Sequence, residues 1–151
     1  MKVFISHSTK DMEIVERFRK LIEPKIETYV AAKDPQPGKP LWAKIEANIK
    51  GSNYLVAIMT RNGSRSEMVQ SEIATARANK IPVIPIIEEG VSLKGILAGI
   101  EYITFDNNHP DQALKDASIY LSKLKKQTDI DSVGILVLAL LAIFGLSQMS
   151  D

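Results

Sequence analysis

Hydrophobic residues along this chain form short runs that alternate with longer amphipathic segments. Residues 2–6 and 54–59 are mostly apolar, which is typical of strands buried on both faces of a sheet. In residues 11–23, by contrast, the apolar side chains recur at helical spacing. The expected strands are residues 2–6, 28–32, 54–59, 81–87 and 101–105, and the expected helices are residues 11–23, 41–50, 67–79 and 110–126. This alternation predicts an α/β fold with a parallel sheet that helices cover on both faces.

Two segments interrupt the alternation. Residues 33–40 contain three prolines and a glycine, which forbid regular structure and predict a loop. Residues 81–87 are apolar but include Pro82 and Pro85, so we expect this strand nearer an edge of the sheet.

The C-terminal segment differs in kind from the rest. Residues 132–150 carry no charge, and they follow a helix that ends in three lysines at 123, 125 and 126. One interpretation is a transmembrane anchor with the preceding domain on the cytoplasmic face of the cell membrane. The other is a buried or oligomer-forming helix of a cytoplasmic protein. We therefore expect a globular domain over residues 1–128 and a hydrophobic helix over residues 129–151.

Composition excludes several functions. The chain has 151 residues, a net charge of +1, no cysteine and two histidines. The near-zero charge gives no reason to expect nucleic-acid binding. The lack of cysteine rules out disulfides and thiolate metal sites, and two histidines far apart in sequence do not form a zinc-binding pattern, so no metal is expected.

One carboxylate stands out among the predicted helices. Glu72 follows Met68 by four residues, so the two side chains share a helix face that should pack inward. The helix also follows directly on the apolar strand of residues 54–59. A carboxylate there either forms an ion pair, with Arg65 or Arg77 as candidates, or lines a cleft at the carboxyl ends of the strands.

Two strings in the first half of the chain resemble signatures of one family. Residues 3–11, Val-Phe-Ile-Ser-His-Ser-Thr-Lys-Asp, resemble the first signature of the TIR domain family in its microbial form. The loop with Pro37 and Gly38, together with Ile45 and Ile49 after it, resembles the second signature, which comprises the BB loop and the following helix.

A third string follows in the family's order and spacing. Residues 66–73, Ser-Glu-Met-Val-Gln-Ser-Glu-Ile, resemble the stretch Ser-x-Trp-x-x-x-Glu, with Met68 where an aromatic is common. The resemblance covers about residues 1–106 and leaves the tail outside. It implies a flavodoxin-like five-stranded sheet in the order 2-1-3-4-5.

The resemblance also implies an activity. Many microbial TIR domains cleave NAD at the nicotinamide–ribose bond, with NAD as substrate and no cofactor, and their catalytic glutamate falls on Glu72. Members that cyclise the ADP-ribose product often carry Trp-x-x-x-Glu, which Trp42 and Glu46 match. The remaining candidate substrate contacts are Ser6, His7, Asp34 and Ser66. Self-association through TIR surfaces and the BB loop is also expected.

The chemistry is consistent with a single carboxylate. Cleavage of an N-glycosidic bond builds an oxocarbenium-like centre, which a fixed carboxylate stabilises. Nicotinamide leaves as a neutral molecule, so no strong general acid is needed. An aromatic face at Trp42 would hold the two ends of ADP-ribose together and favour cyclisation.

Other functions remain open or are disfavoured. The main alternative is a non-catalytic TIR module that assembles partners, and another is a nucleoside deoxyribosyltransferase-like enzyme. A phospho-receiver domain is disfavoured, because Ser6 and His7 replace the expected acidic pair and Thr60 replaces the phosphoacceptor aspartate. No Gly-x-Gly-x-x-Gly follows the first strand, which disfavours a Rossmann dinucleotide site.

Overall fold

The computed structural model describes residues 1–148, apart from the side chains of residue 96 and residues 135–148. Its strands are β1 (Lys2–Ser6), β2 (Glu27–Tyr29), β3 (Tyr54–Met59), β4 (Val83–Glu88) and β5 (Ile103–Phe105). Its α-helices are α1 (Met12–Ile22), α2 (Leu41–Lys50), α3 (Arg61–Ser64), α4 (Glu67–Ala78) and α5 (Asp111–Gln148). Short 3-10 turns are η1 (Thr9–Asp11), η2 (Ala31–Lys33) and η3 (Gly95–Leu97).

The strands form one parallel sheet in the order β2-β1-β3-β4-β5. This confirms the expected flavodoxin-like topology. The central strands β1 and β3 are buried along almost their whole length, which explains why their residues are apolar without alternation. Because all strands are parallel, their carboxyl ends meet at one edge of the sheet, where the loops after β1, β3 and β4 lie close together.

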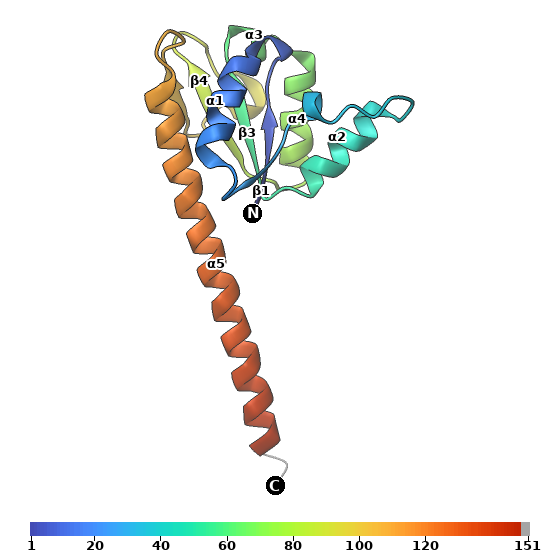
Figure 1. Cartoon of the computed structure of the whole chain (residues 1–151), viewed down its shortest axis with the longest axis vertical. Coiled ribbons are helices and arrows are strands. Elements are labelled where there is room, and N and C mark those ends of the chain that lie inside the picture. Colours follow the sequence, from blue (N-terminus) through green and yellow to red (C-terminus); the bar gives the residue numbers. More distant parts are fainter. Residues whose placement is uncertain (149–151) are drawn as a thin grey trace. The chain divides into compact units, whose positions relative to one another are not determined.

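Helices cover both faces of the sheet, with α1 on one side of the strands and α2 and α4 on the other (Figure 1). On the α2 and α4 side, Ile45 and Ile49 of α2 pack with Val69 and Ile73 of α4 into a cluster that includes Phe4 of β1. The two residues of each pair are four positions apart, which places them on one helix face. This packing positions the middle of α4 beside the end of β1.

The structure differs from the expected elements in two main places. The predicted strand at 28–32 is shorter and earlier, because the chain turns into η2 after Tyr29. The short helix α3 was not expected. It begins after Thr60, whose side chain accepts a hydrogen bond from the Gly63 N–H at 2.9 Å. By contrast, β4 lies nearer the edge of the sheet as expected: its neighbour β5 is the edge strand, and Pro85 comes one residue before the stretch that pairs with β5.

Helix α5 runs without a break from Asp111 to Gln148, so the expected helices at 110–126 and 129–151 belong to one continuous element. No proline or glycine lies between them, and i,i+4 pairs such as Lys125 with Asp129 at 3.3 Å span the interval. Contacts divide the chain into two units, Met1–Ser118 and Ile119–Asp151.

The membrane anchor expected at residues 132–150 finds no support in the described part of the chain. No helix there is long and apolar enough to cross a membrane. Charged residues continue along α5 as far as Asp131, whereas a span needs about 20 mainly apolar residues. The rest of the expected anchor falls on the side chains of 135–148 and on residues 149–150, which lie outside the description.

Candidate active site

The local structure fixes Glu72 at the end of β1. Ser66 caps α4, and its hydroxyl accepts a hydrogen bond from the Val69 N–H at 3.3 Å. The helix that starts there turns Glu72 inward, and only 4% of the residue is exposed. At that depth the Ser6 hydroxyl, at the last position of β1, donates a hydrogen bond to Glu72 Oε2. A single bond thus joins residues 66 positions apart in sequence.

The second carboxylate oxygen, Oε1, is free. It makes no hydrogen bond within the described residues, and neither Arg65 nor Arg77 forms an ion pair with it there. No buried polar side-chain atom in the described part of the chain lacks a hydrogen-bond partner. Oε1 is therefore not sealed in the core and reaches the adjoining hollow. The ion-pair interpretation of Glu72 is wrong, and the cleft interpretation holds.

Burial changes the acidity of this carboxyl group. Removal from water raises the pKa of Glu72 to about 7, and the hydrogen bond from Ser6 opposes the shift by stabilising the carboxylate. Near neutral pH the group therefore exists in both protonation states.

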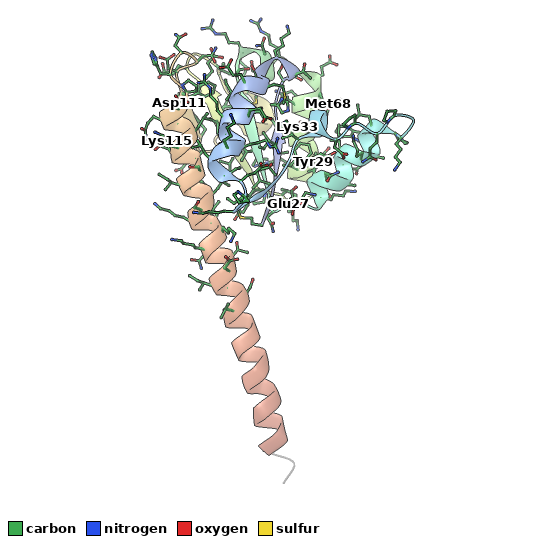
Figure 2. The ribbon with its side chains drawn as sticks, viewed as in Figure 1. Glu27, Tyr29, Lys33, Met68, Asp111 and Lys115 are labelled. Atoms are coloured by element: carbon green, nitrogen blue, oxygen red, sulfur yellow. The ribbon has the colours of Figure 1, made fainter. Side chains whose placement is uncertain are left out.

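Glu72 forms one wall of a small hollow of about 200 Å³. Most of the wall is apolar, which accounts for the unfavourable environment of the charge. Met68 stands at its rim, 43% exposed, instead of packing in the core as the sequence suggested; Figure 2 shows it at the surface. The other lining residues are Ile5, His7, Thr9, Ala31, Ala32, Leu41 and Ile45.

His7 contributes a polar edge to this hollow. Its Nδ1 lies 2.7 Å from the Ser8 carbonyl oxygen, which can only accept, so Nδ1 carries a proton and donates. In the neutral ring Nε2 is then an acceptor for a ligand. A hydrogen bond ties the segment after β1, which carries His7, to the end of β3: the buried Asp11 carboxylate accepts it from the Thr60 hydroxyl at 2.5 Å.

A second hollow, of about 380 Å³, lies under the loop of residues 34–40. It shares Ala31, Ala32 and Leu41 with the Glu72 hollow, so the two adjoin. The loop carries Pro35, Pro37 and Pro40, all of which line it.

Asp34 fastens this loop to the domain. Its carboxylate accepts hydrogen bonds from the Tyr29 hydroxyl at 3.0 Å and from Gln36 Nε2 at 3.1 Å. Its carbonyl oxygen accepts one from Lys44 Nζ. The bonds from Gln36 and Tyr29 lower the pKa of Asp34, whereas burial and the hydrogen bond to Asp34 raise the pKa of Tyr29 to about 12. Asp34, a candidate substrate contact in the sequence, lies in the loop's own hydrogen-bond network.

Trp42 and Glu46 lie on one face of α2, as their spacing predicts, but neither lines the Glu72 hollow. Trp42 is 39% exposed, and Glu46 pairs with Lys50 at 2.8 Å. Trp42 follows Leu41, which does line the hollow.

Of the sequence candidates, the structure brings Ser6, His7 and Glu72 together, while Ser66 acts as the helix cap. Sequence reasoning missed Thr9 and the two alanines of η2. Small residues in a turn carry no chemical signature, so only the fold could have found them.

The site defines a class of protein: a flavodoxin-like α/β domain with a buried, unpaired carboxylate in a cleft at the strand ends. The family model described as TIR domain matches residues 3–118. This chain therefore belongs to the TIR domain family. No curated protein matches it significantly.

Solved structures share the fold. The TIR domain of a Toll-related receptor from Hydra magnipapillata matches with a TM-score of 0.65 and 19% identity, over 78% of this chain and 94% of that one. A CMP N-glycosidase from Clostridium botulinum matches with a TM-score of 0.60 and 20% identity, over 80% of this chain and 99% of that one. A 2-deoxyribosyltransferase from Bacillus psychrosaccharolyticus matches with a TM-score of 0.61 and 10% identity, over 78% of this chain and 90% of that one.

Proposed function

We propose that this protein cleaves NAD⁺ at the nicotinamide–ribose bond and that Glu72 is its catalytic residue. The observation that carries the proposal is the placement of Glu72: buried, unpaired, held at Oε2 by Ser6, and with Oε1 facing a cleft. An ordinary surface or structural glutamate has no need of such an environment. The names of two similar structures, an N-glycosidase and a deoxyribosyltransferase, agree with chemistry at an N-glycosidic carbon.

The reaction asks little of the protein beyond charge and position. The bond between ribose C1′ and the nicotinamide nitrogen breaks, and its electron pair leaves with the now neutral nicotinamide. Positive charge develops on the ribose, where the Glu72 carboxylate stabilises it within apolar walls that strengthen the interaction. Water then adds to C1′ and releases a proton, which gives ADP-ribose. The carboxylate must be ionised for this role, so activity rises with pH through the pKa of Glu72.

The two adjoining hollows suggest how the substrate lies. The Glu72 hollow, at about 200 Å³, is smaller than typical ligand sites and suits the nicotinamide riboside end alone. The rest of the dinucleotide then extends under the loop, into the hollow of about 380 Å³. In this arrangement Asp34 and Lys44 act by shaping the wall and not by touching the ribose.

Cyclisation of the product is a further part of the proposal that rests on Trp42. The indole is partly exposed next to Leu41, where it can stack on a base that leaves the cleft. Self-association through the loop of residues 34–40 would bring the surface of a second copy of the chain close to Trp42 and the cleft.

A non-catalytic interaction module is the competing function. It is favoured by one observation: Leu41 and Met68, which line the Glu72 hollow, and Trp42, which follows Leu41 in α2, are all large, apolar and substantially exposed. Such side chains form the rim of a substrate site or a docking surface equally well.

Product analysis decides between the two. Purified full-length protein is incubated with NAD⁺ at several protein concentrations, and nicotinamide, ADP-ribose and cyclic products are separated by chromatography and identified by mass. We expect nicotinamide release, and a loss on the order of a hundredfold or more in Glu72→Gln. Glu101→Gln, at an exposed position, is the matched control. Release of no nicotinamide at any concentration would favour the interaction module.

A further inference from the structure

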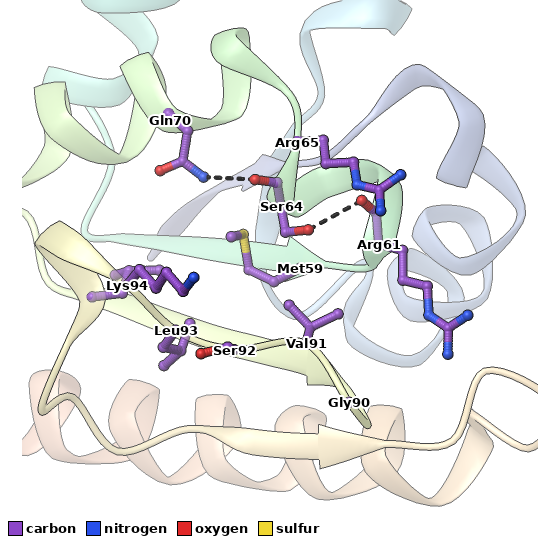
Figure 3. A pocket seen from close by; sticks show the side chains of 11 residues that line it. Met59, Arg61, Ser64, Arg65, Gln70, Gly90, Val91, Ser92, Leu93 and Lys94 are labelled. Carbon is purple, nitrogen blue, oxygen red and sulfur yellow. Dashed lines mark hydrogen bonds between the residues drawn. The ribbon is translucent and has the colours of Figure 1, made fainter.

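A larger hollow, of about 600 Å³, lies apart from Glu72 at the carboxyl ends of β3 and β4 (Figure 3). One wall comes from α3 and the start of α4, and the other from the loop that follows β4. Its volume falls within the range of small-molecule sites, and ligands of open α/β sheets bind at this edge.

The charge around this hollow is one-sided. Arg61, Arg65 and Lys94 all line it, and none of its lining residues is acidic. Arg61 Nε lies 3.7 Å from a carboxylate oxygen of Glu88, which offsets part of its charge. Arg65 and Lys94 form no ion pair within the described residues. Two uncompensated cations at one concave surface favour an anionic ligand.

The interior suits an organic rather than an inorganic anion. The buried side chains of Met59 and Leu97 form an apolar floor. In Figure 3, Met59 lies between Ser64 on one wall and Val91 of the loop after β4 on the other. Gln70 Nε2 donates to the Ser64 carbonyl at 3.4 Å, which leaves the Gln70 carbonyl oxygen for a ligand hydroxyl.

This hollow is separate from the Glu72 site. The two share no lining residue. They flank the same helix, because Gln70 and Glu72 are two positions apart on α4 and so point to different sides of it.

We propose that this hollow is a second ligand site, and that it binds a small organic phosphate: the phosphate at Arg65 or Lys94, and an apolar or planar portion on the Met59 and Leu97 floor. The proposal does not depend on NAD⁺ cleavage by Glu72.

Equilibrium binding of AMP to the full-length protein, measured by calorimetry, tests it, with adenosine as the ligand that lacks the phosphate. We expect AMP to bind in the millimolar range or tighter and adenosine about tenfold more weakly. The double variant Arg65→Glu, Lys94→Glu should lose about tenfold or more in AMP affinity. All four positions of this variant and of its control Lys20→Glu, Arg77→Glu are exposed, and circular dichroism checks their folding.

Three results would overturn the proposal. AMP fails to bind the wild type, or the Arg65 and Lys94 double variant binds as well as its control, or adenosine binds as tightly as AMP. A third variant, Glu72→Gln, locates the ligand and supplies a fourth possible refutation. Unchanged AMP binding supports the second site, whereas a loss equal to that of the double variant places AMP in the Glu72 hollow and refutes it.

Discussion

Replacement of Glu72 by glutamine should make the folded protein more stable, by an amount that depends on pH. Glutamine keeps the size of the side chain and can still accept the hydrogen bond from Ser6, but it cannot ionise. Glutamate in this place must either hold a proton or leave a charge in apolar surroundings. The substitution therefore removes an energetic cost that exists only where the carboxyl group is ionised.

The magnitude follows from the pKa of Glu72, which rises from 4.5 to about 7 on folding. Because the folded state holds the proton more tightly, its stability is complete below pH 4.5 and is lost as pH rises through about 7. At about 1.4 kcal/mol per pKa unit, the loss reaches about 3 kcal/mol above pH 7 and stays below about 1 kcal/mol at pH 5. Glu72→Gln does not lose this unfolding free energy, because glutamine does not ionise.

Urea unfolding at pH 5 and pH 8 measures the difference. The gain in unfolding free energy of Glu72→Gln over the wild type should be about 2 kcal/mol larger at pH 8 than at pH 5. Other titrating groups are common to both proteins and cancel. The exposed control Glu101→Gln should show nearly the same small difference at both values. An equal gain for Glu72→Gln at pH 5 and pH 8 would refute the account of a buried, charge-disfavouring site.

Four further outcomes are expected. Ser6→Ala removes the bond that lowers the pKa of Glu72, so the acidic limb of the kcat/KM profile for NAD⁺ cleavage should move to higher pH; an unmoved limb would exclude Glu72 as the titrating group. Trp42→Ala should fold, since the indole is 39% exposed, and should shift cyclic product toward linear ADP-ribose by chromatography; a wild type that makes only linear product contradicts the cyclase assignment. Lys44→Met removes the hydrogen bond from Lys44 Nζ to the Asp34 carbonyl oxygen, which holds the loop of residues 34–40, and should raise KM for NAD⁺ roughly tenfold with kcat little changed. An unchanged KM would show that this loop does not contact the substrate. Deletion of residues 132–151 tests the anchor predicted from sequence by membrane fractionation: we expect both forms to fractionate alike, because no described stretch of α5 is long and apolar enough to cross a membrane, and release of the truncated form only would reinstate the anchor.

The sequence predicted the fold where burial leaves a simple pattern. β1 and β3 lie within the expected ranges because strands buried on both faces are apolar throughout. β2 has a mixed burial pattern at the sheet edge, so its ends could not be placed. The four residues of α3 are too few to show a helical period.

The candidate site was predictable only in part, for a similar reason. Glu72 was found through its helix and the string around it, but its bond to Ser6 depends on how β1 and α4 pack, which local sequence does not encode. In the sequence, an aspartate that contacts substrate looks the same as one that only holds its own loop, so the role of Asp34 could not be read from its residue type. Only the loop conformation shows that Tyr29 and Gln36 already occupy its oxygens.

The loop of residues 34–40 bears on the entropy of binding. Three of its residues are proline, whose fixed φ leaves few backbone conformations to lose, and Asp34 and Lys44 fasten one end. A flexible wall would have to be ordered each time a ligand entered, and affinity would fall by that amount. Here most of the ordering takes place when the chain folds, so a ligand meets a cleft whose wall is already in position.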